Sequence, residues 1–320
     1  MEFSPRHQSV SLNIDLQECS LAGSTTILLA APWVPPPPAE PAAPSLVLFV
    51  GDATQSAPPA EPAAPAVPAN VPLSIALHCS WRISIDKVSI DGVETRFRFR
   101  TQPKPEPIVG TVTPNTPRSD FNLFLPADDN EEELEVDIPP SVQQRIATEP
   151  VSTPAEHTFS LLIQYRCRDP QGGVYFYSST PGTVSHAYTE NQHSSARIWL
   201  PCFDNPTDRC TWDFEIIASK QHTIIMSGDH FVERAIEGGL KARTARINSP
   251  IDAPSLAFAV GEFAEYPDLF IDRVFHYAPR SELAKVAHTV QFLSRAYDFY
   301  LVRGVNSFFL CALTAWIGVP

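Results

Sequence analysis

The chain has 320 residues, of which 43% are hydrophobic, so it is long enough to bury one large or two medium cores. Its 23 basic and 36 acidic residues give a net charge of −13, which repels phosphate backbones and argues against autonomous DNA binding. No run of about 18 apolar residues could span a bilayer, and residues 1–6 lack the pattern of a signal peptide. We therefore expect an intracellular, soluble protein with no membrane partner.

The opening segment predicts a strand followed by an unusual insertion. Apolar residues alternate with polar ones at Val10, Leu12, Ile14 and Leu16, which is typical of a half-buried strand, and residues 21–29 are expected to return as its hairpin partner. Residues 32–72 then contain thirteen prolines and the octapeptide P-P-A-E-P-A-A-P twice. This composition indicates a polyproline-like insertion, which is either a tolerated loop expansion or a docking site for a proline-binding module.

A second hairpin carries a row of arginines. Strand-like runs at 81–90 and 95–100 are joined by Asp91-Gly92, a turn-forming pair. The later run places Arg96, Arg98 and Arg100 on one face and two phenylalanines on the other. The arginines are either a solvated sheet face or a contact surface for acidic partners or DNA. Seven of the ten residues at 128–137 are acidic, which predicts a solvated loop.

The rest of the chain is rich in strands until its last part. Strand-like segments recur at 159–168, 174–178, 210–219, 223–226, 242–251, 255–263 and 273–277, with frequent turn signals, so we predict a mainly β protein with a sandwich or saddle-like sheet. Apolar spacings of three and four from Ser281 to Tyr300 predict an amphipathic helix. The uncharged run from Phe309 to Pro320 is interpreted as a truncated or misread gene end.

Few residues combine into a chemical site. The six cysteines contain no C-x-x-C pair and are expected to be reduced; Cys202 and Cys210 are close enough in sequence to leave a zinc or disulfide role open. His193 next to Ser194-Ser195 is a weak candidate for a nucleophile and base, because neighbouring positions rarely supply that geometry. Asp204 is expected to cap the turn at Asn205-Pro206.

One segment carries a family resemblance. Residues 197–206 read R-I-W-L-P-C-F-D-N-P, and they follow Y-R-C-R at 165–168 and precede S-G-D at 227–229 and A-P-S-L-A-F-A-V-G-E-F at 253–263. This series closely resembles the amino-terminal domain of the aminopeptidase N-like zinc peptidases. The C-T-W at 210–212 and the S-G-D-H-F-V-E at 227–233 resemble the non-catalytic branch of that family that belongs to the general transcription factor TFIID.

The resemblance implies a saddle-like β-sandwich over residues 1–280, followed from 281 to 320 by the first helix of a truncated peptidase-like domain. It implies a nuclear scaffold without cofactors, whose partners are TBP, the other TFIID subunits and core promoter DNA. A helix left without its companion domain would expose an apolar face, so we predict poor solubility for this chain by itself. Two alternatives stay open: the amino-terminal part of an active zinc aminopeptidase, or a plain β-sandwich binding module.

Catalysis by these 320 residues is not expected. Zinc peptidases of this family use H-E-x-x-H on a helix, yet none of the nine histidines here is four residues from another. The G-x-M-E-N loop that binds the substrate amine is absent as well. The resemblance does place Gln192 where active relatives contact the substrate amino group, but we favour a loop amide bonded to nearby backbone over a retained amine contact. We therefore assign no catalytic or metal-binding residue.

Overall fold

The computed structural model describes residues 3–31, 74–100, 134–148, 158–170, 172–180, 183–191, 194–269, 271, 274–293, 295–296 and 299. The predicted proline-rich insertion and the tail from Phe309 lie outside these residues. Within the described part, no helix is long and apolar enough to cross a membrane.

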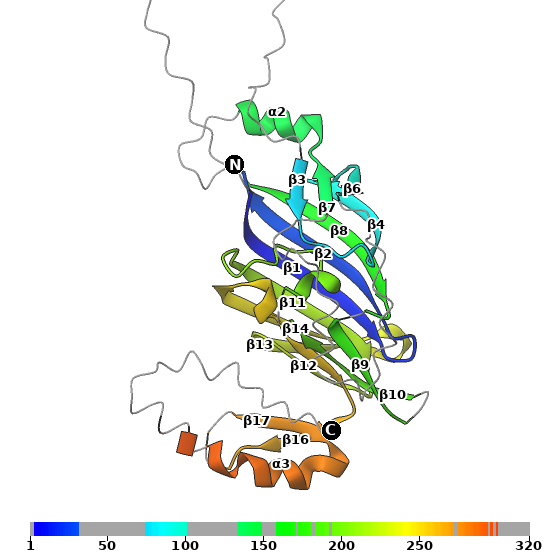
Figure 1. Cartoon of the computed structure of the whole chain (residues 1–320), viewed down its shortest axis with the longest axis vertical. Helices are drawn as coiled ribbons and strands as arrows, with labels where there is room; N and C mark the ends of the chain where they lie inside the picture. Colours follow the sequence, from blue (N-terminus) through cyan, green and yellow to red (C-terminus); the bar gives the residue numbers. More distant parts are fainter. Residues whose placement is uncertain are drawn as a thin grey trace, which may run out of the picture.

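An eight-stranded sheet forms the body of the molecule (Figure 1). Its spatial order is β13-β14-β11-β1-β2-β8-β4-β5; β1 and β11 run parallel, and the other neighbours are antiparallel. The strands are β1 (Ser4–Asp15), β2 (Ser20–Ala30), β4 (Ser84–Ile90), β5 (Val93–Glu94), β8 (Thr158–Arg168), β11 (Cys210–Ser219), β13 (Asp229–Ile236) and β14 (Leu240–Ile251).

Three smaller sheets complete the β structure. One has the order β3-β7-β6, with β3 at Ser74–Leu77, β7 at Leu134–Asp137 and β6 at Phe97–Phe99. Another has the order β12-β15-β10-β9, with strands Thr223–Met226, Phe258–Gly261, Thr183–Glu190 and Gly173–Thr180. The third pairs β16 (Phe263–Pro267) with β17 (Phe275–Pro279). Figure 1 shows the β3-β7-β6 sheet at one end of the body and β16-β17 beyond the other end.

Helices are few and short in the described residues. They comprise α2 (Pro140–Thr148), α3 (Leu283–Thr289) and the 3₁₀ turns η2 (Ala196–Ile198), η3 (Glu237–Gly239), η4 (Ala253–Ser255), η5 (Arg280–Glu282) and η6 (Val290–Phe292). The helix α3 packs on β16 and β17 and buries Val286. The mainly β saddle-like fold and a helix after the sheets are therefore confirmed.

One core joins the large sheet to the two neighbouring sheets. The inner side chains of β1 and β8, among them Leu12 and Leu161, are buried in the same cluster as Leu77 of β3 and Val260 of β15. The outward residues of β1 are polar, which is why the sequence alternates. Gly23 lets β1 and β2 approach closely, because a Cβ there would lie 1.9 Å from the carbonyl oxygen of Ser11.

The predicted arginine hairpin is wrong in its second half. Asp91 and Gly92 both have positive φ, of 49° and 80°, so the predicted two-residue turn is confirmed. However, β5 ends at Glu94, and the chain then leaves the large sheet to form β6, which pairs with β7. The partner of the arginine strand is therefore the end of the acidic run, and not the strand before the turn.

Two other expectations also need correction. The acidic segment 128–137 was expected to be a solvated loop throughout, but Leu134 and Val136 are fully buried in β7. The alternation of L-E-V-D is the strand signal, which the density of charge obscured. Helix α2 was not predicted either, because its nine residues are too few for a clear helical period.

Candidate functional site

The family motif lies inside the sandwich. The segment begins as the 3₁₀ turn η2 and continues into residues whose side chains are fully buried: Trp199, Leu200 and Cys202. Backbone bonds attach it to the segment after β3: the N–H of His78 donates to the carbonyl of Cys202 at 2.9 Å, and the N–H of Cys202 donates back at 3.0 Å. The motif thus joins the β3-β7-β6 sheet to the eight-stranded sheet.

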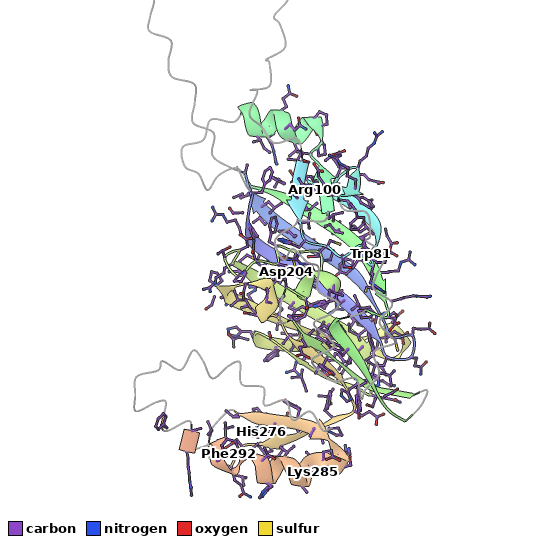
Figure 2. All side chains as sticks on the ribbon, in the orientation of Figure 1. Trp81, Arg100, Asp204, His276, Lys285 and Phe292 are labelled. Atoms are coloured by element: carbon purple, nitrogen blue, oxygen red, sulfur yellow. The ribbon has the colours of Figure 1, made fainter. Side chains whose placement is uncertain are left out.

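A buried ion pair closes the motif on itself. Both the backbone N–H and Nε of Arg197 donate to Oδ2 of Asp204, each at 3.1 Å. The side chains are 2% and 0% exposed, and Figure 2 shows Asp204 in the middle of the body. Burial raises the pKa of Asp204, and Arg197 acts in the opposite direction. Asp204 therefore binds Arg197, which corrects its expected role as a cap for the Asn205-Pro206 turn.

His78 supports this pair from the neighbouring segment. Its Nδ1 accepts the backbone N–H of Asp204 at 2.9 Å, so the ring proton lies on Nε2. Burial, and secondly the charge of Arg197, lowers the pKa of His78 to about 4, and the ring is neutral at physiological pH. Nothing in the sequence connects this histidine with a motif more than a hundred residues later, and sequence reasoning missed it.

The other end of the motif is attached to the β12-β15-β10-β9 sheet. Trp199 donates from Nε1 to Oδ1 of Asn191 at 2.9 Å, and Asn191 in turn donates to the carbonyl of Leu256. Gly173 has φ of 66°, and a Cβ there would lie 2.3 Å from the carbonyl oxygen of Ser195. The motif connects the sheets and, because its polar groups are buried, offers no reactive group to solvent. Oδ1 of Asp204 and Nε2 of His78 have no hydrogen-bond partner among the described residues.

The other sequence candidates do not form a reactive site in the described residues. Gln192 and His193 lie outside them, so the proposed amine contact and the weak nucleophile pair stay predictions. Cys202 and Cys210 are both free and buried, which excludes the disulfide, and burial raises the pKa of Cys210 to about 12. Within the described ranges, no three histidine, cysteine, aspartate or glutamate side chains are grouped to hold a metal ion.

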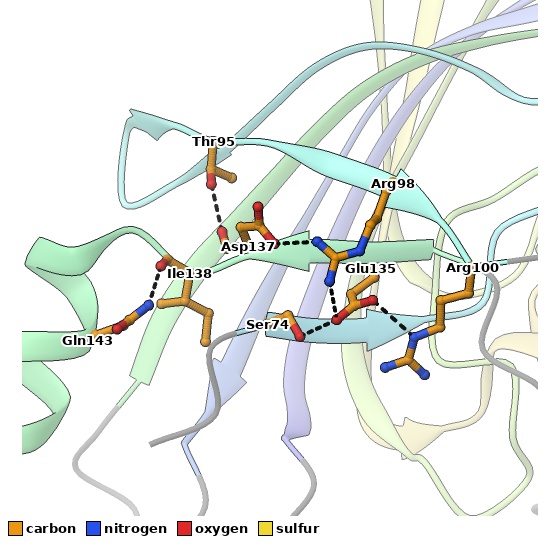
Figure 3. Close-up of polar contacts among 8 residues, drawn as sticks. All are labelled: Ser74, Thr95, Arg98, Arg100, Glu135, Asp137, Ile138 and Gln143. Atoms are coloured by element: carbon orange, nitrogen blue, oxygen red, sulfur yellow. Dashed lines mark hydrogen bonds and ion pairs between the residues drawn. The ribbon is translucent and has the colours of Figure 1, made fainter. Parts of the chain in front are cut away.

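The arginine row lies on the exposed face of β6 and β7 (Figure 3). Arg98 bridges two carboxylates, with Nη2 at 2.9 Å from Oε1 of Glu135 and Nη1 at 3.0 Å from Oδ1 of Asp137. Arg100 approaches the other oxygen of Glu135 at 3.3 Å. The Ser74 hydroxyl, and then Arg100 and Arg98, lower the pKa of Glu135. Two of the three predicted contact residues are thus bound to acids of the next strand.

The outer face of the large sheet carries a second polar surface. A shallow hollow of about 720 Å³ crosses β2, β1, β11, β14 and β13, and its lining mixes serine and threonine with charged and apolar residues. Its charges are paired across strands: Arg246 donates to Asp213 at 2.8 Å, and Arg234 donates to Glu215 at 2.7 Å. This balance of charge gives the hollow no preference for a cationic or an anionic ligand.

Comparisons with known proteins fit the fold and the motif. The profile of the Peptidase M1 N-terminal domain matches residues 73–243, which is more than half of the chain. Transcription initiation factor TFIID subunit 2 of Drosophila melanogaster is 31% identical over 147 residues, and that of Danio rerio is 26% identical over 145. Each match covers 43% of this chain and 12% of the relative, so the chain represents a small part of these proteins.

Solved structures give the same fold. Native yeast LTA4 hydrolase superposes with a TM-score of 0.53 at 16% identity, covering 88% of this chain and 32% of the hydrolase. A second structure, leukotriene A4 hydrolase from Saccharomyces cerevisiae, gives a TM-score of 0.52 at 17% identity. At this identity the likeness concerns the fold alone. The resemblance drawn from residues 165–263, both to the peptidase family and to its TFIID branch, is confirmed.

Proposed function

The chain belongs to the Peptidase M1 N-terminal domain family, and we propose that it acts as a non-catalytic scaffold within the general transcription factor TFIID. The observation that carries the proposal is the similarity to TFIID subunit 2 of two animals. On this proposal the protein is nuclear, and its partners are TBP, the TBP-associated factors and, through the complex, core promoter DNA.

The chemistry of the motif supports a structural role. The buried polar contacts of the motif hold the sheets together; they involve the Arg197–Asp204 pair, His78 and Trp199. A rigid body of this kind can present surfaces to neighbouring subunits without catalysing a reaction. The net charge of −13 further favours contact with DNA through the assembled complex, since an isolated acidic body is repelled by phosphates.

The domain division is part of the same proposal. We propose that residues 1–280 form the aminopeptidase-like β domain and that residues 281–320 begin a second, peptidase-like domain. Phe292 and Phe299, near α3, are 63% and 52% exposed, which suits a surface that further protein would cover.

The alternative is that the chain is the amino-terminal domain of an active zinc aminopeptidase. The fold that the chain shares with yeast LTA4 hydrolase is compatible with this alternative. The coding sequence beyond residue 320 discriminates between the two. An in-frame H-E-x-x-H, with zinc-dependent release of amino-terminal residues from peptides, would establish the enzyme and give Gln192 a substrate to bind.

Rapid depletion of the full-length protein in its own cells tests the scaffold. If the protein supports assembly of the transcription machinery on promoters, its depletion lowers the occupancy of core promoters by TBP and RNA polymerase II. Unchanged occupancy, with the protein fully removed, would contradict the proposal. As the matched control, depleted cells receive either an intact copy of the protein or a copy in which the motif at residues 197–206 is disrupted.

A further inference from the structure

Strand β6 forms one edge of its sheet in the part of the chain that the structure describes. On its inner side it pairs with β7, and the N–H of Asp137 donates to the carbonyl of Arg96 at 2.9 Å. Backbone groups alternate in direction along an antiparallel strand, so the N–H and C=O groups of Phe97 and Phe99 point away from β7. Such an edge is a template on which another strand can pair.

The side chains of this strand favour a partner that carries negative charge. Arg96, Arg98 and Arg100 occupy alternate positions, and each of them is exposed. The strand on the inner side already illustrates the preference, because β7 offers Glu135 and Asp137 at alternate positions to Arg98. Arg96 makes no ion pair within the described ranges, and its charge is therefore available at the start of the edge.

We propose that the open edge of β6 binds an extended peptide segment of a partner protein that carries aspartate or glutamate at alternate positions. The segment adds a fourth strand to the β3-β7-β6 sheet and pairs with the backbone of Phe97 and Phe99. Its carboxylates lie beside the arginines on the side opposite β7. The row of positive charge then lies between two acidic strands, which is a favourable cross-strand arrangement.

A peptide fits this edge better than a nucleic acid does. The backbone of β6 presents donors and acceptors at the spacing of a strand, and a phosphate backbone has no donor to return. The net charge of −13 also opposes the binding of a phosphate backbone. The inference goes beyond membership of TFIID, since it concerns one edge and is measured on the protein alone.

The test uses the full-length protein and two labelled synthetic hexapeptides of equal composition. One alternates valine and glutamate; in the other the three glutamates are consecutive. Fluorescence anisotropy measures binding, and amide hydrogen exchange locates it. We expect the alternating peptide to bind more tightly and to slow exchange at the amides of Phe97 and Phe99.

Two variants and one control separate charge from backbone pairing. Arg96→Glu reverses the available charge and should weaken binding about fivefold, the scale of an exposed charge pair turned repulsive. Phe97→Pro removes the outward N–H at an edge position where proline is tolerated, and it should abolish binding. Arg168→Glu makes the same charge change at an exposed position of β8 and should leave binding within about twofold.

Four results would overturn the inference. These are equal binding of both peptides, binding that Arg96→Glu leaves unchanged, slow exchange at Phe97 and Phe99 before any peptide is added, and binding of a DNA duplex in place of the peptide with the same dependence on Arg96. The third would mean that this chain already covers the edge. Should Phe97→Pro fail to fold, Arg96→Glu still decides the outcome.

Discussion

Replacing His78 should change how the stability of the sandwich depends on pH. His78→Asn keeps an acceptor for the backbone N–H of Asp204, because an asparagine oxygen sits close to the place of Nδ1, and it removes the titrating ring. In the folded chain the pKa of His78 is lowered from 6.5 to about 4, by burial and then by Arg197. In the unfolded chain the ring regains its ordinary pKa.

The sign and size of the effect follow from that difference. Between the two pKa values the unfolded chain binds a proton that the folded chain does not, so the free energy of unfolding falls as the pH falls. From pH 7 to pH 5 the His78 contribution amounts to about 2 kcal/mol, and it approaches about 3 kcal/mol below the folded pKa. This is a large part of a typical stability of about 5–15 kcal/mol.

Urea unfolding at pH 7 and pH 5, followed by tryptophan fluorescence, measures the effect. The buried Trp199 and Trp212 report loss of the core. Burial also lowers the pKa of His186 and His222, but these contributions cancel when the variant is compared with the unchanged chain. We expect the loss of stability on acidification to be about 2 kcal/mol smaller in His78→Asn. Equal losses in the two proteins would refute the argument.

Three further predictions concern the core. Asp204→Ala should cost about 3–5 kcal/mol in urea unfolding, because it leaves Arg197 charged and buried; Asp86→Ala, in an exposed pair, should cost under about 1 kcal/mol, and similar costs would contradict the account. Gly23→Ala should lower the free energy of unfolding by about 3 kcal/mol or more, because the added methyl group meets the backbone of β1. Gly238→Ala should lower it by about 1 kcal/mol, because the space there is open and only the positive φ opposes alanine. Equal melting temperatures of the two variants would contradict this prediction. A thiol reagent at pH 8 should label partly exposed Cys19 in the folded chain and, only after unfolding, the buried thiols of Cys79, Cys167 and Cys202; rapid labelling of all four would show that the core is open.

Strands could be predicted from the sequence where the order of apolar and polar residues matches the order of buried and exposed positions. The strands β11 and β12 begin and end at the predicted residues, and in each of them buried and partly exposed positions alternate. Strand β13 was missed because every residue in it is at least partly exposed and no alternation marks it. The strand β6 was assigned to the wrong partner, since local turn chemistry at Asp91-Gly92 says nothing about where the chain goes three residues later.

The motif could be recognised from the sequence, whereas its function in the fold could not. R-I-W-L-P-C-F-D identified the family, yet the pairing of Arg197 with Asp204 and the support from His78 depend on segments brought together by the tertiary structure. An aspartate before Asn-Pro fits a turn cap equally well on local grounds. Burial decides between the two roles, because a fully desolvated arginine requires a carboxylate partner.

Affinity purification of the full-length protein from nuclear extract tests the central claim most directly. If the protein is a scaffold of TFIID, mass spectrometry of the purified material finds TBP and the TBP-associated factors in stoichiometric amounts. Recovery of the full-length protein free of every TFIID subunit would contradict the account.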